Sequence, residues 1–316
     1  MAHDARLLII GLSALLGATV LGAPQGIAAE ARKPAATDKA APTPAAPPAA
    51  DKPAPTFQAS QPASEKADPA AGASRLAAGL KALEERRYDE ALSAFNEAYG
   101  FGEPEGAFYL GRMVELGVGV QGDFDKARVL YLAAAEKGSA RAMNRLGLMH
   151  YRGEKVLQDY HAAFEMICKA ADAGDADGAF NCAGLHADGR GTPKDLTRAI
   201  AYYEKAAAKG HIGALNALGF AYRDGLGVAA DRAKSLAFFE RAAAKGNPVG
   251  LFELGAILEA GQSVPRDLAK AHLYYNLAAA RQHPGASAAL QRVTAELSDE
   301  EVVKAQNAAK AWKAGD

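Results

Sequence analysis

Residues of the same type return every 36 positions through most of this 316-residue chain. In each of five blocks a glycine is followed six residues later by an aspartate. A period of this length is typical of stacked helical repeats and not of a globular enzyme core. The glycines are Gly117, Gly153, Gly189, Gly225 and Gly261, and the aspartates are Asp123, Asp159, Asp195, Asp231 and Asp267.

The block that begins at Asn144 predicts a pair of helices. A first helix runs to about Tyr151, and Gly153 ends it, where a left-handed backbone is easiest for glycine. The carboxylate of Asp159 then caps the start of a second helix. The apolar residues of that second helix form a single stripe, made of Ala163, Ile167, Ala170 and Ala171.

Two kinds of unit are present. In the shorter one, Gly79 and Ala91 are 12 residues apart, which resembles a tetratricopeptide repeat. In the later units the interval is 16, as between Gly147 and Ala163, and a Gly-x-Gly-Val-x-x-Asp loop takes up the difference. This longer unit resembles the Sel1-like repeat family, most closely in Leu218-Gly219, Tyr222, the loop 225–228, Asp231 and the segment 242–246.

The resemblance implies an all-α fold, a right-handed α-α superhelical solenoid of helix pairs. We expect the domains to be a signal peptide or uncleaved anchor over 1–31, a disordered Pro/Ala-rich linker over 32–73, a tetratricopeptide-like repeat over 74–104, five Sel1-like repeats over 105–282 and capping helices over 283–316. In the cap, Ser298 and Glu301 form a capping box. The apolar stripe that closes the array is Val302, Ala305, Ala309 and Trp312.

The N-terminus has the pattern of an export signal. Arg6 precedes an apolar run from Leu7 to Leu21, which is shorter than the roughly 20 residues of a membrane-spanning helix. Small residues follow at Ala28, Ala29 and Ala31, where cleavage is expected. We therefore expect a periplasmic or secreted protein, with a membrane role only if the segment stays uncleaved.

Composition and motifs exclude several classes of function. The net charge is −1, without the basic footprint that nucleic acid binding requires. Neither Ser-x-x-Lys nor His-Glu-x-x-His occurs. His150 and His186 occupy equivalent positions in successive repeats, 36 residues apart. Equivalent residues of stacked repeats should be about 10 Å apart, too far to bind one metal ion together. We predict no enzyme activity, catalytic residue, cofactor or metal.

The chain contains two cysteines, Cys168 and Cys182. They are nearly equidistant from the turn at Gly174, so an antiparallel helix pair brings them to the same height. A disulfide requires Cα atoms within about 7 Å. In an oxidising compartment the pair is a candidate disulfide staple, and the alternative, two buried thiols, stays open.

By resemblance to tetratricopeptide arrays, the first helices line a concave face that holds an extended protein segment. We expect asparagine side chains there to bind a peptide backbone and phenylalanine rings to hold apolar anchors. The alternative is that the rings pack between repeats. The predicted contact residues are Phe108, Arg112, Asn144, Tyr151, Phe180, Asn216, Arg223 and Phe252.

Together these patterns predict a monomeric, non-catalytic, exported scaffold of the bacterial envelope that binds a protein. A regulator that restrains a membrane sensor or envelope enzyme is the second interpretation. An enzyme acting on cell-wall material or β-lactams is the third, and the missing nucleophile and base argue against it.

Overall fold

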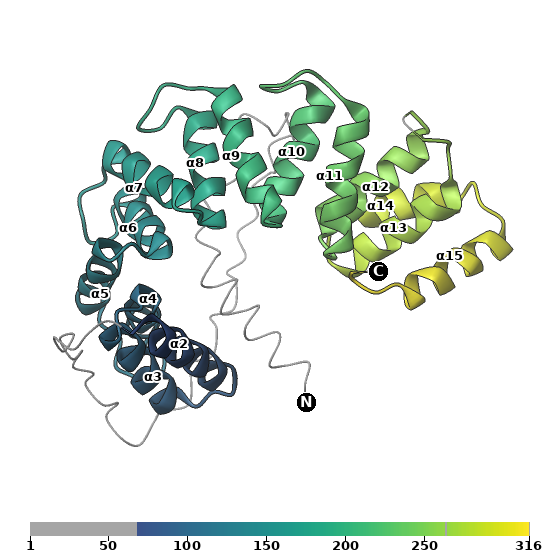
Figure 1. Ribbon diagram of the computed structural model, residues 1–316. Helices are drawn as coiled ribbons and strands as arrows, with labels where there is room; N and C mark the ends of the chain where they lie inside the picture. The colour runs from purple at the N-terminus through teal and green to yellow at the C-terminus, as the bar shows by residue number, and fades with distance from the viewer. Residues whose placement is uncertain (1–67, 263, 316) are drawn as a thin grey trace, which may run out of the picture. The chain divides into compact units, whose positions relative to one another are not determined.

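The computed structural model describes residues 68–262 and 264–315, and every regular element in these ranges is an α-helix (Figure 1). The fold is an all-α solenoid of consecutive helix pairs. The helices are α2 (Pro69–Glu84), α3 (Tyr88–Gly100), α4 (Pro104–Leu116), α5 (Phe124–Glu136), α6 (Ala140–Arg152), α7 (Tyr160–Asp172), α8 (Ala176–Asp188), α9 (Leu196–Ala208), α10 (Ile212–Asp224), α11 (Arg232–Ala244), α12 (Pro248–Ala260), α13 (Leu268–Ala280), α14 (Ala286–Thr294) and α15 (Asp299–Ala311).

Helix α2 begins before the boundary that the sequence predicted at residue 74. The Asp68 carboxylate accepts hydrogen bonds from the N–H groups of Ala70 and Ala71, at 3.1 and 3.0 Å. Pro69 occupies the first turn, where its missing N–H costs nothing. The predicted signal segment, and the linker as far as residue 67, lie outside the described residues.

The repeated glycines and aspartates have the predicted roles. The five glycines that end the first helices have φ between 64° and 70°, the left-handed region that side chains disfavour. Each of the five aspartates accepts at least one hydrogen bond from the first turn of the next helix. The loop between the two helices of a unit is thus set by local residue chemistry.

Glycines also allow the two helices of a unit to approach closely. A Cβ atom added to Gly219 would lie 2.6 Å from the Phe239 ring, and one added to Gly255 would lie 2.7 Å from the Tyr275 ring. In the same unit as Gly219, the Ser235 hydroxyl donates a 2.8 Å hydrogen bond to the Gly219 carbonyl. This bond accommodates serine in a column that holds alanine in the other four Sel1-like units.

The second loop glycine of a unit covers the first residue of the preceding unit's second helix. A Cβ atom on Gly227 would lie 2.8 Å from Leu196, and one on Gly119 would lie 2.4 Å from Tyr88. Lys155 replaces this glycine in one unit and adopts a φ of 52°. Its ammonium group lies 5.5 Å from the centre of the Phe124 ring, so the lysine keeps the loop-to-helix contact.

The described residues form two compact units, one of residues 68–181 and 190–192, the other of residues 182–189, 193–262 and 264–315. The core of the first is built around Phe95, Leu110 and Tyr131. In the second, Phe239 and Leu254 are at the centre of one cluster and Tyr275 of another.

The C-terminal helices close the second unit as predicted. Ser298 and Glu301 form the capping box at the start of α15. Ala309 and Trp312 pack against the cluster that contains Phe239, and Arg281 lies 5.0 Å from the Trp312 ring centre. Within the described ranges, no helix combines the length and apolarity needed to cross a bilayer.

Candidate protein-binding surface

Four of the eight predicted contact residues are buried. Phe108, Arg112, Asn144 and Phe180 are each at most 7% exposed, so their side chains do not line an open groove. This corrects their assignment as partner contacts. Phe108 packs on Tyr131 of its own repeat, whereas Asn144 faces the next repeat, where it accepts a hydrogen bond from Asn181. A 36-residue pattern alone does not contain these packing directions.

The phenylalanine rings of this set pack within the protein. Phe108 lies 5.8 Å from the ring of Tyr131, and Phe252 lies 5.3 Å from Tyr275. Phe252 also stacks on the imidazole of His283, at 4.2 Å between ring centres. Each of these partners belongs to the same 36-residue unit as its phenylalanine, so the rings pack inside their own repeat, and the alternative of packing between repeats stays a prediction.

The asparagines pair with other asparagines. The Asn181 amide donates a hydrogen bond to Asn144 over 3.1 Å, and the Asn216 amide donates one to Asn247 over 3.1 Å. Asn247 also caps α12 by accepting from Gly250 N–H. These bonds use Asn144 Oδ1 and Asn216 Nδ2, two of the groups that the sequence assigned to a peptide backbone, while Asn216 Oδ1 has no hydrogen-bond partner among the described residues.

Arg112 belongs to a buried ion-pair network in the first unit. Glu115 contacts both Arg112 and Arg145, and these three side chains are at most 10% exposed. Glu115 also accepts a hydrogen bond from the Tyr131 hydroxyl. Burial alone raises the pKa of Glu115, but Arg145, Arg112 and the Tyr131 hydroxyl outweigh it and lower that pKa. The network fixes α4 against α5 and α6.

Tyr151 is only partly buried and belongs to an aromatic cluster. Its ring lies 5.3 Å from Tyr160, and the Arg190 guanidinium lies 5.4 Å from the Tyr151 ring and 5.8 Å from the Tyr160 ring. Leu157, in the loop between α6 and α7, is 91% exposed. This is the most exposed large apolar side chain of the described residues.

Arg223, the remaining predicted contact, lines a surface pocket of about 190 Å³ in the second unit. It donates to Glu253 over 3.1 Å and to Asp224 over 2.8 Å, and it lies 4.8 Å from the Phe220 ring. Ala256, Ile257 and Ala260 of α12 give the pocket an apolar wall. Its other lining residues are Arg232, Ser235 and Gln262.

Two properties of the pocket bear on chemistry. Burial raises the pKa of Glu253, although the guanidinium of Arg223 acts in the opposite direction. The Ser235 hydroxyl is buried and donates to a backbone carbonyl, so it is not poised as a nucleophile. The pocket is therefore suited to binding a group by charge and apolar contact.

Sequence reasoning overlooked Arg232, although the repeat contains the signal. The equivalent residues that begin the other second helices are apolar: Phe124, Tyr160, Leu196 and Leu268. Arg232 alone is charged, and its side chain forms no ion pair or hydrogen bond with the described residues. A comparison of the first residue of each second helix would have identified Arg232 as the one charged residue at this position.

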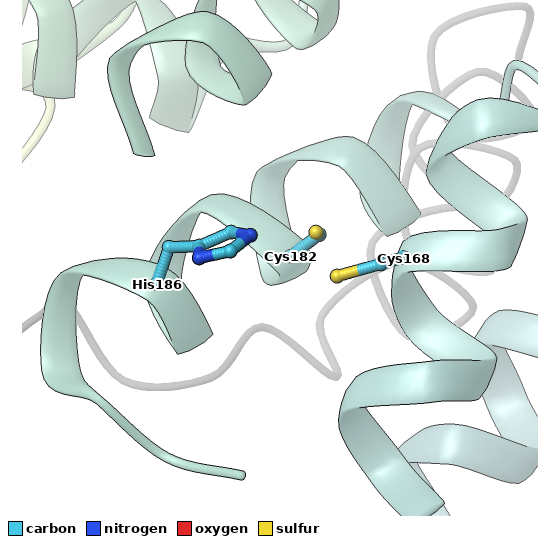
Figure 2. Close-up of side chains that lie close together, drawn as sticks. All are labelled: Cys168, Cys182 and His186. Carbon is cyan, nitrogen blue, oxygen red and sulfur yellow. The ribbon is translucent and has the colours of Figure 1, made fainter. Parts of the chain in front are cut away.

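Figure 2 shows Cys168, Cys182 and His186 close together. Their sulfur atoms and one imidazole nitrogen lie within 4.8 Å of one another, and all three residues are buried. Both cysteines are disulfide-bonded, which decides between the two alternatives that the sequence left open. Cys₂His is a zinc-type ligand set, but zinc binds thiolates, which a disulfide does not supply.

The Sel1 repeat pattern matches residues 104–139, 140–175, 176–211, 212–247 and 248–283, more than half of the chain. A Sel1 repeat protein from Oxalobacter formigenes has a similar structure, with 28% identity, a TM-score of 0.63, and coverage of 74% of this chain and 98% of that one. A protective antigen of uropathogenic Escherichia coli with an SLR fold has 26% identity and a TM-score of 0.64. That match covers 74% of this chain and 51% of the antigen, about half its length. No curated protein matches the sequence significantly.

Proposed function

Since the chain belongs to the Sel1 repeat family, we propose that it is a non-catalytic, exported scaffold that binds a protein partner through its first helices. Proteins of this family generally act as protein-interaction modules. The observation that carries the proposal is the pocket beside α12, which combines an apolar wall with two arginines and a partly buried glutamate. Such a combination of apolar and charged groups anchors extended segments in repeat proteins.

Export is supported by the N-terminal sequence. The apolar run from Leu7 to Leu21 follows Arg6 and precedes small residues at the expected cleavage position. A fusion of residues 1–67 to alkaline phosphatase tests this part of the proposal. Activity in the periplasm of a bacterial host is the expected result, and activity only when the fusion is released into an oxidising medium contradicts it.

Site-specific photo-crosslinking tests partner binding with the full chain. A photoreactive phenylalanine replaces Ala260, which is exposed at the pocket, and in a matched variant it replaces Val129, which is 60% exposed on α5. We expect a discrete adduct from Ala260 in cells that produce the protein, and none from Val129. Equal adducts from both sites, or none from either, would contradict a partner held at the α12 pocket.

A further inference from the structure

Arg232 breaks the repeat at a position that is otherwise filled by a large apolar side chain. In the neighbouring unit the equivalent Leu196 lies under the loop glycine Gly227. Arg232 is instead exposed, and the space beside it is the pocket of about 190 Å³. The pocket thus lies where a charged arginine replaces the large apolar side chain of the other repeats.

The charges that line the pocket are not balanced. The charged side chains of the lining are Arg223, Arg232 and Glu253, two positive and one negative. Arg223 pairs with Glu253, and also with Asp224, which is not part of the lining. Arg232 has no such counter-charge among the described residues, so it supplies an unmatched positive charge at the pocket. A bound carboxylate would be attracted to it, whereas a bound lysine or arginine would be repelled.

The wall of the pocket restricts the occupant further. Ala256, Ile257 and Ala260 offer only apolar surface, which suits methylene groups. A glutamate side chain has two methylenes that end in a carboxylate. It therefore matches both the wall and the charge.

We propose that this pocket binds a glutamate side chain in an extended segment of the partner protein, with the carboxylate on Arg232 and the methylenes on α12. The inference rests on the proposed function, because it names the group by which the partner is held. Arg223 acts as a positioning residue, since it keeps the Glu253 carboxylate paired and so prevents it from repelling the ligand.

The test uses the full chain with ¹⁵N-labelled arginine and three seven-residue peptides, acetylated and amidated to remove terminal charges. The peptides have glutamate, glutamine or lysine at the centre of a Gly-Ser sequence. The signal of the Arg232 side-chain N–H is followed during titration to millimolar peptide. Arg198, 71% exposed in the first turn of α9 and outside the pocket, is the internal control.

We expect the glutamate peptide to shift the Arg232 signal and leave Arg198 unchanged, with binding about tenfold weaker for glutamine. The Arg232→Glu variant lacks the reporting signal, so binding to it is followed at the side-chain N–H of Arg223, which also lines the pocket. Arg232→Glu should abolish binding of the glutamate peptide and gain binding of the lysine peptide, whereas Arg198→Glu should do neither. Equal binding of glutamate and glutamine, preference of the parent protein for lysine, or no shift with any peptide would overturn the inference.

A second arm separates this inference from the proposed function. The photo-crosslinking at residue 260 is repeated in the Arg232→Glu background. If the parent protein forms the adduct and Arg232→Glu forms it equally well, the scaffold function stands and the glutamate assignment fails. If the parent protein forms no adduct, the proposed function itself fails.

Discussion

Tyr275 donates a 2.6 Å hydrogen bond to the carboxylate of Glu259, and Tyr131 donates in the same way to Glu115 four repeats earlier. In both cases the glutamate lies in the last turn of the first helix of a unit, and the tyrosine lies 16 residues later on the second helix. In two other repeats the residues equivalent to this glutamate and tyrosine are Tyr151 with Ile167, and Arg223 with Phe239, which cannot form the same bond. The two columns thus form this bond where the sequence supplies both partners.

The two Glu–Tyr pairs should differ in their contribution to stability. Glu115 neutralises two buried arginines, so Glu115→Gln should lower the free energy of unfolding by about 3 kcal/mol. Glu259 pairs with Arg292, which is 56% exposed, and Glu259→Gln should cost about 1 kcal/mol. Urea denaturation of both variants at pH 7 measures the difference, and equal costs would contradict it.

The Glu115 effect should also depend on pH. Its pKa is lowered in the folded protein, so its stabilising contribution is present above the ordinary value of 4.5 and is lost as pH falls through the lower folded value. The stability gap between the parent protein and Glu115→Gln should therefore narrow below about pH 4.5. Urea denaturation at a series of pH values measures this gap, and a gap that is constant down to pH 3 would refute the prediction.

Asp175 should have the opposite pH dependence. It caps α8 by accepting from Gly178 N–H at 2.6 Å, while burial, followed by the nearby Asp177, raises its pKa to about 6. A carboxyl pKa raised on folding gives stability below the unfolded value, near 3.8, that is lost as pH rises through about 6. Asp175→Asn keeps the cap, so at pH 7 it should be more stable than the parent by up to about 3 kcal/mol.

The Asp175→Asn gain should disappear below about pH 4, where both side chains are neutral. Thermal unfolding of both proteins between pH 3 and 8 measures it. Asp175→Ala serves as the control, because it removes both the charge and the helix cap. It should therefore be about 1 kcal/mol less stable than Asp175→Asn at pH 7. A parent protein that is more stable than Asp175→Asn at pH 7 would contradict the burial argument.

Gly255→Ala should destabilise the second unit. The new Cβ would lie 2.7 Å from Tyr275, whose ring is buried and whose hydroxyl is bonded to Glu259. Overpacking of this kind costs about 1–3 kcal/mol. Gly100→Ala is the matched control: no atom lies within 4 Å of its Cβ, and the helix should gain about 0.5 kcal/mol. Equal shifts of the denaturation midpoint in Gly255→Ala and Gly100→Ala would contradict a steric clash between the added Cβ at position 255 and Tyr275.

Loss of the disulfide should destabilise the protein without changing its fold. A bridge from Cys168 to Cys182 closes a loop of about 15 residues, for which chain entropy predicts about 3 kcal/mol. The Cys168→Ala/Cys182→Ala variant should unfold at a lower urea concentration and keep its helical circular dichroism. The parent protein treated with reductant should match that variant. Labelling of both cysteines by iodoacetamide without reductant or denaturant would contradict the bridge.

Residue patterns alone were sufficient to predict the ends of the repeated helices. The glycines from Gly117 to Gly261 and the aspartates from Asp123 to Asp267 have the predicted conformations, because helix ends depend on residues only a few positions apart. The capping box at Ser298 is local in the same sense. The proximity of Cys168 and Cys182 could also be predicted from the sequence, because in a short helical hairpin residues equally distant from the turn lie side by side.

Which repeat positions are buried and which are exposed depends on the packing of the helices against one another. Phe108 and Asn144 are on the first helices, as expected, yet both are buried: Phe108 packs on Tyr131 of its own repeat, and Asn144 accepts a hydrogen bond from Asn181 of the next. The period specifies equivalent positions but not how far each helix is rotated toward its neighbour. The α12 pocket depends on that rotation and on an exception to the pattern, Arg232, where the packing of the other units is not repeated.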